Sequence, residues 1–198
     1  MRHSDMRQHL LTTGLKVLHA RGFNGCSVQE ITDAAKVPKG SFYNHFDSKE
    51  QFGAEVLGRY WEERASRAQS VLSDQSLPPL DRLRAYFLAR TNEDDPGRNG
   101  PSGYTKGCMI GNFSAELAGQ SRLVRDRLGA VLAAWTCLLA TCIREAQHAG
   151  EFGAAIDPET LAAFLIDAFE GAVLRSKVDQ NPAALRRFRE IVFSQLLT

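Results

Sequence analysis

Residues 27–47 read SVQEITDAAKVPKGSFYNHFD, and this stretch indicates the kind of fold that the chain adopts. Ser27 and Glu30 match the S-x-x-E pattern of a capping box, which predicts that a helix begins directly after Ser27. Pro38 suits the start of a further short helix, because its fixed φ fits the first turn. Two short helices joined by a tight connection near Val37 have the proportions of a helix-turn-helix, whose second helix enters the major groove of DNA.

The second of these helices has a polar side that could read base edges. Its polar and donor-rich side chains are Lys39, Ser41, Tyr43, Asn44 and His45. Phe42 and Phe46, four residues apart, would anchor the opposite side on the core. Gly40 has no side chain, so a DNA backbone could approach closely there. On spacing alone, an ordinary pair of capped helices with a solvated polar face is the alternative.

The remainder of the chain predicts more helices and no strands. Leu11, Leu15 and Leu18 recur at helical spacing, and Gly22 would end that helix. Later apolar stripes and caps predict helices over 48–71, 80–91, 106–117 and 124–146, and further helices beginning at Asp157-Pro158 and at Asn181-Pro182. Residues 92–105, NEDDPGRNGPSGYT, predict a loop. We therefore expect an all-α fold of about nine helices, with a three-helix domain over residues 1–50 and a larger helical domain over 51–198.

Composition narrows the class of protein. Of the 198 residues, 43% are hydrophobic and 24% are charged, which is typical of a soluble globular protein. The N-terminus has no apolar region of a signal peptide, and no apolar run reaches the roughly 18 residues of a membrane span. We therefore expect a cytoplasmic protein that does not enter a membrane. The net charge of +1 excludes a strongly basic coat for nucleic acid. Residues 1–50 carry seven Lys or Arg against five Asp or Glu, so DNA affinity should depend on two copies acting together.

A pattern around this helix pair resembles that of the TetR family of transcriptional repressors. The residues that match its V-x-K-G-x-x-Y-x-x-F-x-x-K pattern are Val37, Lys39, Gly40, Tyr43, Phe46 and Lys49. The resemblance implies an all-α homodimer that binds a palindromic operator and is released by a small-molecule effector bound to the C-terminal domain. It places Lys39, Ser41 and Asn44 at bases. It places Tyr43, His45, Lys49 and Ser27 at phosphates.

Four cysteines occur, and Cys108 has the most unusual setting. Lys106 and Gly107 precede it at the expected start of a short helix, where the helix dipole and a nearby lysine lower the pKa of a thiol. The alternative is a small buried core thiol. Cys137 and Cys142 fall on different faces of the long helix and are predicted to line the core or a pocket. No cysteine or histidine spacing suits zinc, so we expect neither a metal nor a cofactor.

A second resemblance concerns Cys108. Residues 107–116 match G-C-x-x-G-N-x-x-x-E, and residues 169–178, FEGAVLRSKV, match E-G-A-x-L-R-x-K. Both patterns are similar to a TetR subgroup that responds to acrylate-like, N-ethylmaleimide-like and reactive chlorine compounds. The resemblance implies that Cys108 and Lys177 take part in sensing; for Lys177 a surface lysine near a helix C-terminus is the alternative. Trp61, Phe113 and Trp135 could line an effector pocket, with core packing as the alternative.

The final two helices are predicted to form the dimer interface. Their apolar stripes are formed by Leu161, Leu165, Phe169, Leu185, Phe188 and Val192. A monomer could bury one such stripe but hardly both, and a two-fold symmetric dimer matches a palindromic DNA site.

We therefore expect a dimeric repressor that is released from DNA by a ligand or by thiol modification, and not an enzyme. The alternatives are a small thiol-dependent enzyme that uses Cys108 and a helical interaction protein without DNA binding. The enzyme is disfavoured because His148 is the only histidine beyond residue 45 and no Ser-His-Asp order or phosphate-binding glycine loop occurs.

Overall fold

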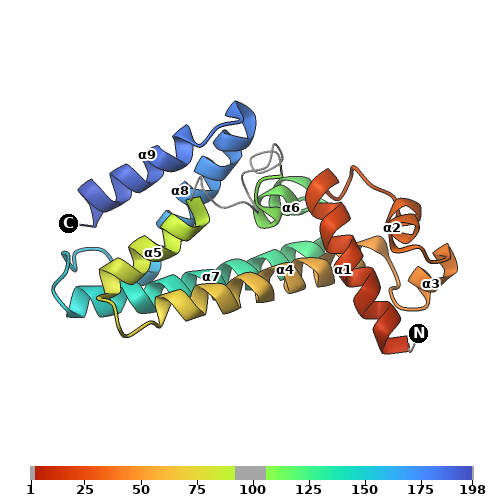
Figure 1. Cartoon of the computed structure of the whole chain (residues 1–198), viewed down its shortest axis with the longest axis horizontal. Coiled ribbons are helices and arrows are strands. Elements are labelled where there is room, and N and C mark those ends of the chain that lie inside the picture. The colour runs from red at the N-terminus through yellow and green to blue at the C-terminus, as the bar shows by residue number, and fades with distance from the viewer. Residues whose placement is uncertain (1–2, 92–105, 198) are drawn as a thin grey trace. The chain divides into compact units, whose positions relative to one another are not determined.

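The computed structural model describes residues 3–91 and 106–197, and within these ranges the secondary structure is entirely helical (Figure 1). The helices are α1 His3–Arg21, α2 Val28–Ala35, α3 Lys39–Tyr43, α4 Lys49–Leu72, α5 Pro79–Thr91, α6 Met109–Leu117, α7 Arg122–His148, α8 Pro158–Asp179 and α9 Ala183–Ile191, followed by a π-helical turn over Val192–Leu196. The predicted all-α fold of about nine helices is confirmed for the described part of the chain. The predicted loop over 92–105 lies outside the described residues.

The helix starts follow the predicted caps closely. The Ser27 Oγ accepts the Glu30 N–H at 3.2 Å, and the Glu30 carboxylate accepts the Ser27 N–H at 2.7 Å, which completes the capping box of α2. The Asp157 carboxylate caps α8 by accepting the Thr160 N–H at 2.9 Å. Gly22 ends α1 with a φ of +77°, a conformation that glycine adopts without steric cost.

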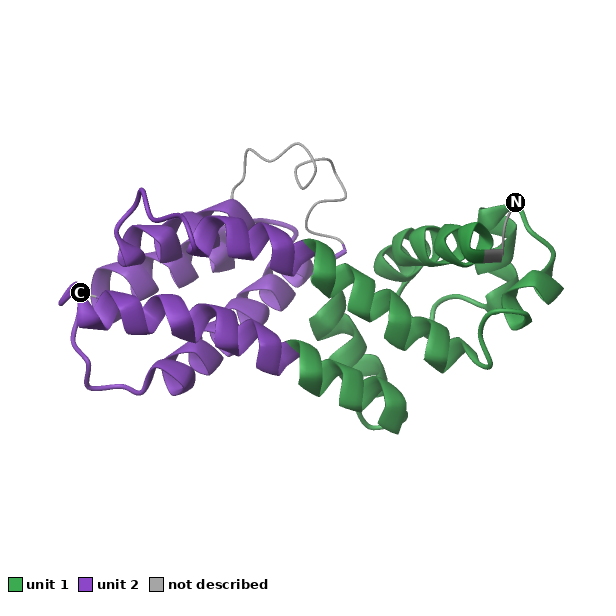
Figure 2. Cartoon of the chain, turned by 90° about the horizontal axis from the view of Figure 1, so that it is seen from below, with its two compact units in different colours: residues 1–63, 108–131 green, residues 64–107, 132–198 purple. Residues whose placement is uncertain are grey.

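The chain divides into two compact units, and neither is a single stretch of sequence (Figure 2). Unit 1 consists of residues 1–63 and 108–131, and unit 2 consists of residues 64–107 and 132–198. The long helices α4 and α7 therefore contribute to both units. The sequence predicts a DNA-binding domain over residues 1–50 and an effector-binding and dimerisation domain over 51–198, and this division stays a prediction.

Unit 1 has an aromatic core beneath α3. The rings of Phe42, Phe46 and Phe52 are buried, with centroids 4.9–5.2 Å apart. A Cβ on Gly14 would lie 2.1 Å from Cζ of Phe52, so only glycine lets α1 approach this ring. The prediction that Phe42 and Phe46 anchor the polar helix is confirmed.

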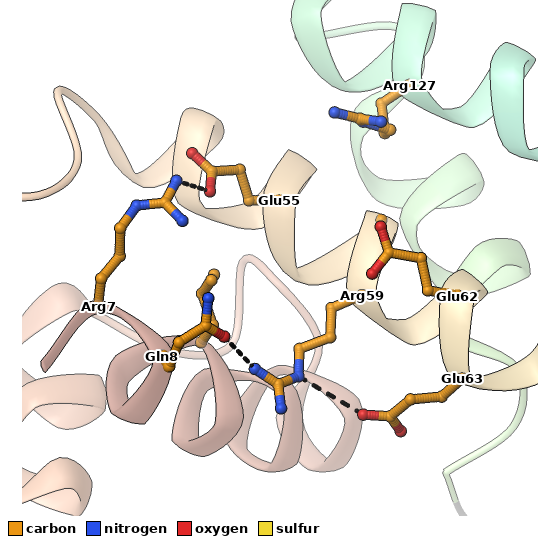
Figure 3. A pocket seen from close by; sticks show the side chains of 9 residues that line it. Arg7, Gln8, Glu55, Arg59, Glu62, Glu63 and Arg127 are labelled. Atoms are coloured by element: carbon orange, nitrogen blue, oxygen red, sulfur yellow. Dashed lines mark hydrogen bonds and ion pairs between the residues drawn. The ribbon is translucent and has the colours of Figure 1, made fainter. Parts of the chain in front are cut away.

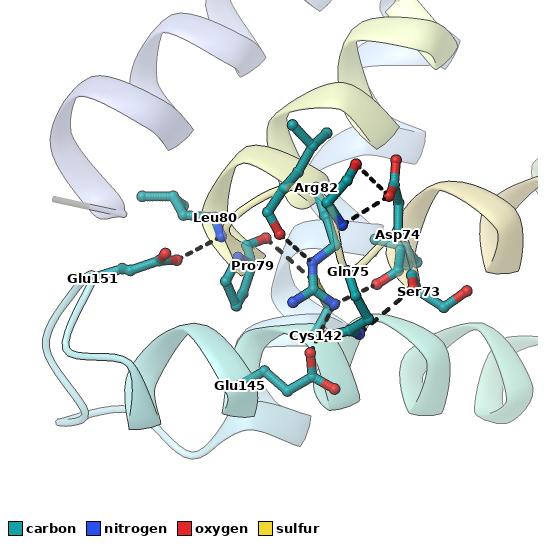
Figure 4. A network of polar contacts seen from close by, with 12 residues as sticks. Ser73, Asp74, Gln75, Pro79, Leu80, Arg82, Cys142, Glu145 and Glu151 are labelled. Atoms are coloured by element: carbon teal, nitrogen blue, oxygen red, sulfur yellow. Dashed lines mark hydrogen bonds and ion pairs between the residues drawn. The ribbon is translucent and has the colours of Figure 1, made fainter.

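Unit 2 is built around a second aromatic core and a buried arginine. Trp135, Phe87 and Phe169 are buried together, and the indole Nε1–H of Trp135 donates to the Tyr86 hydroxyl at 2.7 Å. Arg82 is 3% exposed and donates to the Leu72 carbonyl, the Leu77 carbonyl and the Glu145 carboxylate at 2.8–3.1 Å (Figure 4). This network fixes the end of α4 and the turn before α5 against α7, because each buried carbonyl receives a charged donor.

Among the described residues, α7 alone is long and apolar enough, by length and composition, to cross a membrane. The core helix of a soluble protein passes the same test. Val131, Trp135 and Leu139 of α7 are buried in the fold.

Candidate nucleic-acid interface and thiol site

A tight turn presents α3 directly after α2. Lys36 takes a left-handed conformation with a φ of +56°, and its backbone N–H donates to the Asp33 carbonyl. The Val37 N–H donates to the Thr32 carbonyl at 3.0 Å, which closes the end of α2. Pro38 is the N-cap of α3, in an extended conformation, and therefore stands one residue before the helix itself.

The predicted DNA-reading residues lie on the accessible side of α3. Lys39, Gly40 and Asn44 are exposed, and the Tyr43 side chain is 54% exposed beside the buried Phe42. Ser41 and His45 are half-buried. A Cβ on Gly40 would meet no atom within 4 Å, so the backbone is open there as predicted. The structure thus gathers the six predicted residues of the 39–45 stretch on one short helix and the turn after it.

The two other predicted DNA contacts already have partners within unit 1. Ser27 is exposed, but its hydroxyl bonds to the Glu30 carboxylate as well as to the Glu30 N–H. The ammonium of Lys49 donates to the Phe23 carbonyl at 2.6 Å and lies 4.2 Å from the centroid of the Phe23 ring. An ammonium has three donors, so a phosphate contact by Lys49 is compatible with this bond.

The thiol of Cys108 lies at the beginning of α6. Cys108 is the N-cap residue, and its side chain is 6% exposed. The sequence places the start of this helix near Lys106, whereas α6 begins at Met109, because Gly107 has a φ of +65° and Cys108 is extended. The Tyr60 hydroxyl donates to Sγ of Cys108 at 3.6 Å and accepts the Met109 N–H at 3.2 Å. Tyr60 thus links the sulfur of Cys108 to the first backbone N–H of α6.

Tyr60 is a residue of this site that no sequence pattern pairs with Cys108. It is buried on α4, and its ring packs edge-on against His19 of α1 with centroids 5.4 Å apart. Forty-eight residues separate Tyr60 from Cys108 in sequence, and no local pattern links them.

The other three cysteines differ in exposure and chemistry. Burial raises the pKa of Cys26, and burial raises the pKa of Cys142 to about 11. The Cys142 thiol lies in the Arg82 network, with Sγ 3.3 Å from the Pro79 carbonyl (Figure 4). Both are therefore protonated at neutral pH. Cys137 is exposed, so the predicted core position holds for Cys142 and is wrong for Cys137.

The predicted effector residues belong to both units. Unit 1 contains Cys108, a half-buried Trp61, and Phe113, whose buried ring packs against Phe23 at 5.8 Å between centroids. Unit 2 contains the buried Trp135 and a half-buried Lys177 near the end of α8. A joint role for these residues stays a prediction.

The six apolar residues predicted for the dimer interface lie in unit 2, and two of them, Phe188 and Val192, line a surface groove. Leu161, Leu165, Phe169, Leu185, Phe188 and Val192 are all buried within the single chain. Their role in a dimer interface stays a prediction. Phe164, 55% exposed, and Ile191, 60% exposed, lie with Phe188 and Val192 along this apolar groove of about 540 Å³ between α8 and α9.

A polar pocket of about 450 Å³ lies within unit 1 between α1, α4 and α7 (Figure 3). Arg7 pairs with Glu55, and the Arg59 guanidinium donates to the Gln8 side chain at 2.7 Å and lies 3.5 Å from the Glu63 carboxylate. These bonds fix α1 on α4. The described residues contain no group of three or more His, Cys, Asp or Glu that could hold a metal ion.

Comparisons with known proteins agree on one family. The model of "Bacterial regulatory proteins, tetR family" matches residues 10–56, and that of "Tetracyclin repressor-like, C-terminal domain" matches residues 79–192. The HTH-type transcriptional repressor DhaR of Mycobacterium sp. strain GP1 is 42% identical over 197 residues, which covers 100% of this chain and 95% of DhaR.

Two solved structures are similar over nearly their full length. A TetR regulatory protein from Rhodobacter sphaeroides has a TM-score of 0.84 at 34% identity, covering 96% of this chain and 98% of that one. The reduced form of NemR from Escherichia coli has a TM-score of 0.82 at 29% identity, covering 96% of this chain and 97% of that one.

Proposed function

Because this chain belongs to the TetR family of bacterial transcriptional repressors, we propose that it represses transcription as a homodimer on a palindromic operator and leaves DNA when Cys108 is modified. The observation that carries the DNA-binding role is the geometry of α3, whose buried aromatic side fixes an exposed polar side in one orientation. A repressor of this kind acts in the cytoplasm, where bacterial DNA lies.

The proposed DNA contacts are those that the family resemblance implies, and the exposure of Lys39, Tyr43 and Asn44 supports them. Lys39, Ser41 and Asn44 read bases from α3, and a well-placed pair of hydrogen bonds to one base discriminates by about 1–3 kcal/mol. Tyr43, His45, Lys49 and Ser27 contact phosphates, which fixes the register of α3 in the groove. Gly40 lets the backbone approach the DNA. Because residues 1–50 have only a small positive charge, two copies on one operator supply the affinity.

The proposed dimer interface is the groove between α8 and α9. Exposed Phe164 and Ile191 would be buried against the same groove of a second copy, with Arg175 and Arg187 at its rim. A two-fold interface of this kind presents each surface to its own copy and matches the symmetry of a palindrome.

The proposed effector is a small electrophile that reacts with Cys108. The thiolate forms a C–S bond to an electron-poor alkene carbon, the alkene's π electrons move to the neighbouring carbon, and that carbon takes up a proton. The thiol hydrogen and sulfur thus add across the double bond with no change in oxidation state. Tyr60 contacts the sulfur, and Trp61 and Phe113 of the same unit are proposed to line the approach. A ligand that binds without reacting is the alternative within this function.

DNA binding can be tested on a duplex selected from a random pool by the wild-type protein. At fixed salt, Lys49→Ala and Tyr43→Ala should each weaken binding several-fold by fluorescence anisotropy. Lys16→Ala, which removes the same charge from the exposed side of α1, is the matched control. Unchanged affinity in both Lys49→Ala and Tyr43→Ala would refute this placement of DNA.

Release can be tested with N-ethylmaleimide on the same complex. The wild-type and Cys137→Ser proteins should leave DNA, whereas Cys108→Ser should stay bound. Cys137→Ser is the matched control because that thiol is exposed. Normal release of Cys108→Ser would overturn the thiol mechanism and leave DNA binding intact.

A further inference from the structure

Cys108 lies directly before the N-terminal end of α6. The C-terminal end of α6 contacts the turn that leads into the helix-turn-helix. The Glu116 carboxylate accepts the backbone N–H of Asn24 at 2.7 Å. The same carboxylate faces Gly22, where an added Cβ would lie 2.6 Å from its Oε1. Glu116 therefore occupies the space beside the turn at residues 22–24, directly after α1 ends.

A second side chain of α6 reaches the same turn. Phe113 packs edge-on against Phe23, with ring centroids 5.8 Å apart, and both rings are buried. A Cβ on Gly53 of α4 would lie 2.7 Å from the Phe23 ring, so Phe23 fits tightly between α4 and α6. Phe113 and Glu116 are three residues apart and thus share one side of α6.

The turn at residues 22–24 adjoins two residues that are proposed to contact DNA, Lys49 and Ser27. The carbonyl of Phe23 accepts the ammonium of Lys49, which lies over the Phe23 ring. Ser27, which begins α2, follows Asn24 by three residues. A shift of Phe23 and Asn24 would therefore move the anchor of Lys49 and the entry into α2 together.

The negative charge of Glu116 strengthens its hydrogen bond to the Asn24 N–H. Its carboxylate lies beside the C-terminal end of α1, where the helix dipole disfavours negative charge. An amide or an apolar side chain would suit stability there, whereas a carboxylate makes a short charge-assisted bond that holds one backbone N–H firmly.

We propose that Glu116 is a positioning residue for DNA binding, holding the turn at residues 22–24 in the arrangement that presents α2, α3 and Lys49 to DNA. The regulatory half of this inference rests on the proposed thiol function. Modification of the buried Cys108 enlarges the side chain of the N-cap residue directly before α6 and separates it from Tyr60. Since α6 is a single helix of nine residues, that displacement carries Glu116 away from Asn24.

The inference can be tested by operator affinity, stability and amide exchange together. Glu116→Ala should weaken operator binding about tenfold while the thermal midpoint changes little. Glu116→Gln keeps an acceptor oxygen but loses the charge, so it should restore part of that affinity. Glu62→Ala, an exposed glutamate of α4 in the same unit, is the matched control and should bind like wild type. In wild type, hydrogen exchange at the Asn24 amide should be slow and should accelerate after N-ethylmaleimide treatment.

The outcomes separate this inference from the proposed function. If Cys108→Ser abolishes release but Glu116→Ala retains full affinity and slow Asn24 exchange, the positioning role of Glu116 is overturned and the thiol mechanism stands. If Glu116→Ala weakens binding and speeds Asn24 exchange while N-ethylmaleimide has no effect on wild type, the positioning role is supported and the thiol mechanism fails. A fall in affinity that Glu116→Gln does not restore, accompanied by a lower thermal midpoint, would reduce Glu116 to a structural contact and overturn the inference.

Discussion

The α3 surface and the α8–α9 groove are both exposed, but they are made from opposite kinds of side chain. On α3 the aromatic residues point inward and polar groups such as Lys39 and Asn44 point outward. Along the groove, apolar Phe164 and Ile191 remain outside even though the helices already bury a full apolar stripe. The first surface should bind by charge and hydrogen bonding and weaken steeply with salt, whereas the second should bind by apolar burial and respond little to salt.

The largest effect should come from removing the inward side of α3. Phe42→Ala leaves a cavity in the Phe42–Phe46–Phe52 cluster and should lower the free energy of unfolding by about 3–5 kcal/mol. Urea denaturation measures the change. Tyr43→Ala, which alters the exposed neighbour, should change stability by less than about 0.5 kcal/mol. Equal losses for the two variants would break the distinction between an anchoring side and a reading side.

The next effect should come from placing charge in the groove. Phe164→Asp combined with Ile191→Asp leaves two carboxylates in an apolar contact, which should weaken the dimer by about 3 kcal/mol, or roughly a hundredfold in Kd. Sedimentation velocity over a concentration series measures this, with Leu77→Asp, an exposed leucine away from the groove, as control. An unchanged dimer would show that the groove serves another purpose.

A smaller effect should separate the two kinds of contact on α3. Asn44→Ala and Lys39→Ala should each reduce the preference for the operator over an unrelated duplex by about 1–3 kcal/mol, because base contacts carry the discrimination. Lys49→Ala should weaken both duplexes alike and flatten the dependence of affinity on salt. Titrations at three salt concentrations measure both quantities. If Asn44→Ala lowered both affinities equally, its side chain would not read bases.

The smallest effect concerns the cap that begins α2. Hydrogen bonds from the Ser27 backbone and hydroxyl lower the pKa of Glu30 from its usual 4.5. The folded pKa is therefore below the unfolded one, so this stabilisation is present above about pH 4.5 and disappears as pH falls through the folded value. Wild type should be more stable than Glu30→Gln at pH 7, and the difference should shrink as the pH falls below about 4.5. Ser27→Ala should lower stability by about 0.5–2 kcal/mol at pH 7. A difference between wild type and Glu30→Gln that stays constant with pH would rule out the charge of Glu30 as its source.

Local signals predicted the parts of the fold that local chemistry determines. Ser27 and Asp157 cap helices where their sequence patterns indicate, since a cap depends on residues three positions apart. For α6 the sequence predicts a start near Lys106, three residues before Met109, because it does not reveal the positive φ of Gly107.

The sites are predictable only where they depend on residues that are close together in sequence. Phe42 and Phe46 could be assigned to the core because their spacing defines one side of a short helix. For α8 the pattern predicts an apolar helix, but it does not tell which apolar side meets the chain's own core: Leu165 is buried in unit 2, whereas Phe164 is exposed. The bond between Tyr60 and Cys108, like that between Glu116 and Asn24, depends on distant segments meeting in space.

The composition of unit 1 from two separate stretches has a consequence for how the protein is made and cut. Residues 1–63 leave the ribosome well before residues 108–131. Until α6 is synthesised, one side of the Phe23 ring and the Asn24 N–H therefore stay exposed to solvent. A fragment that ends after α4 would leave this side of the Phe23 ring exposed to solvent, which would favour aggregation. The DNA-reading half therefore cannot be excised by one cut in the chain (Figure 2), and a minimal version would need α6 joined back to it through a designed linker.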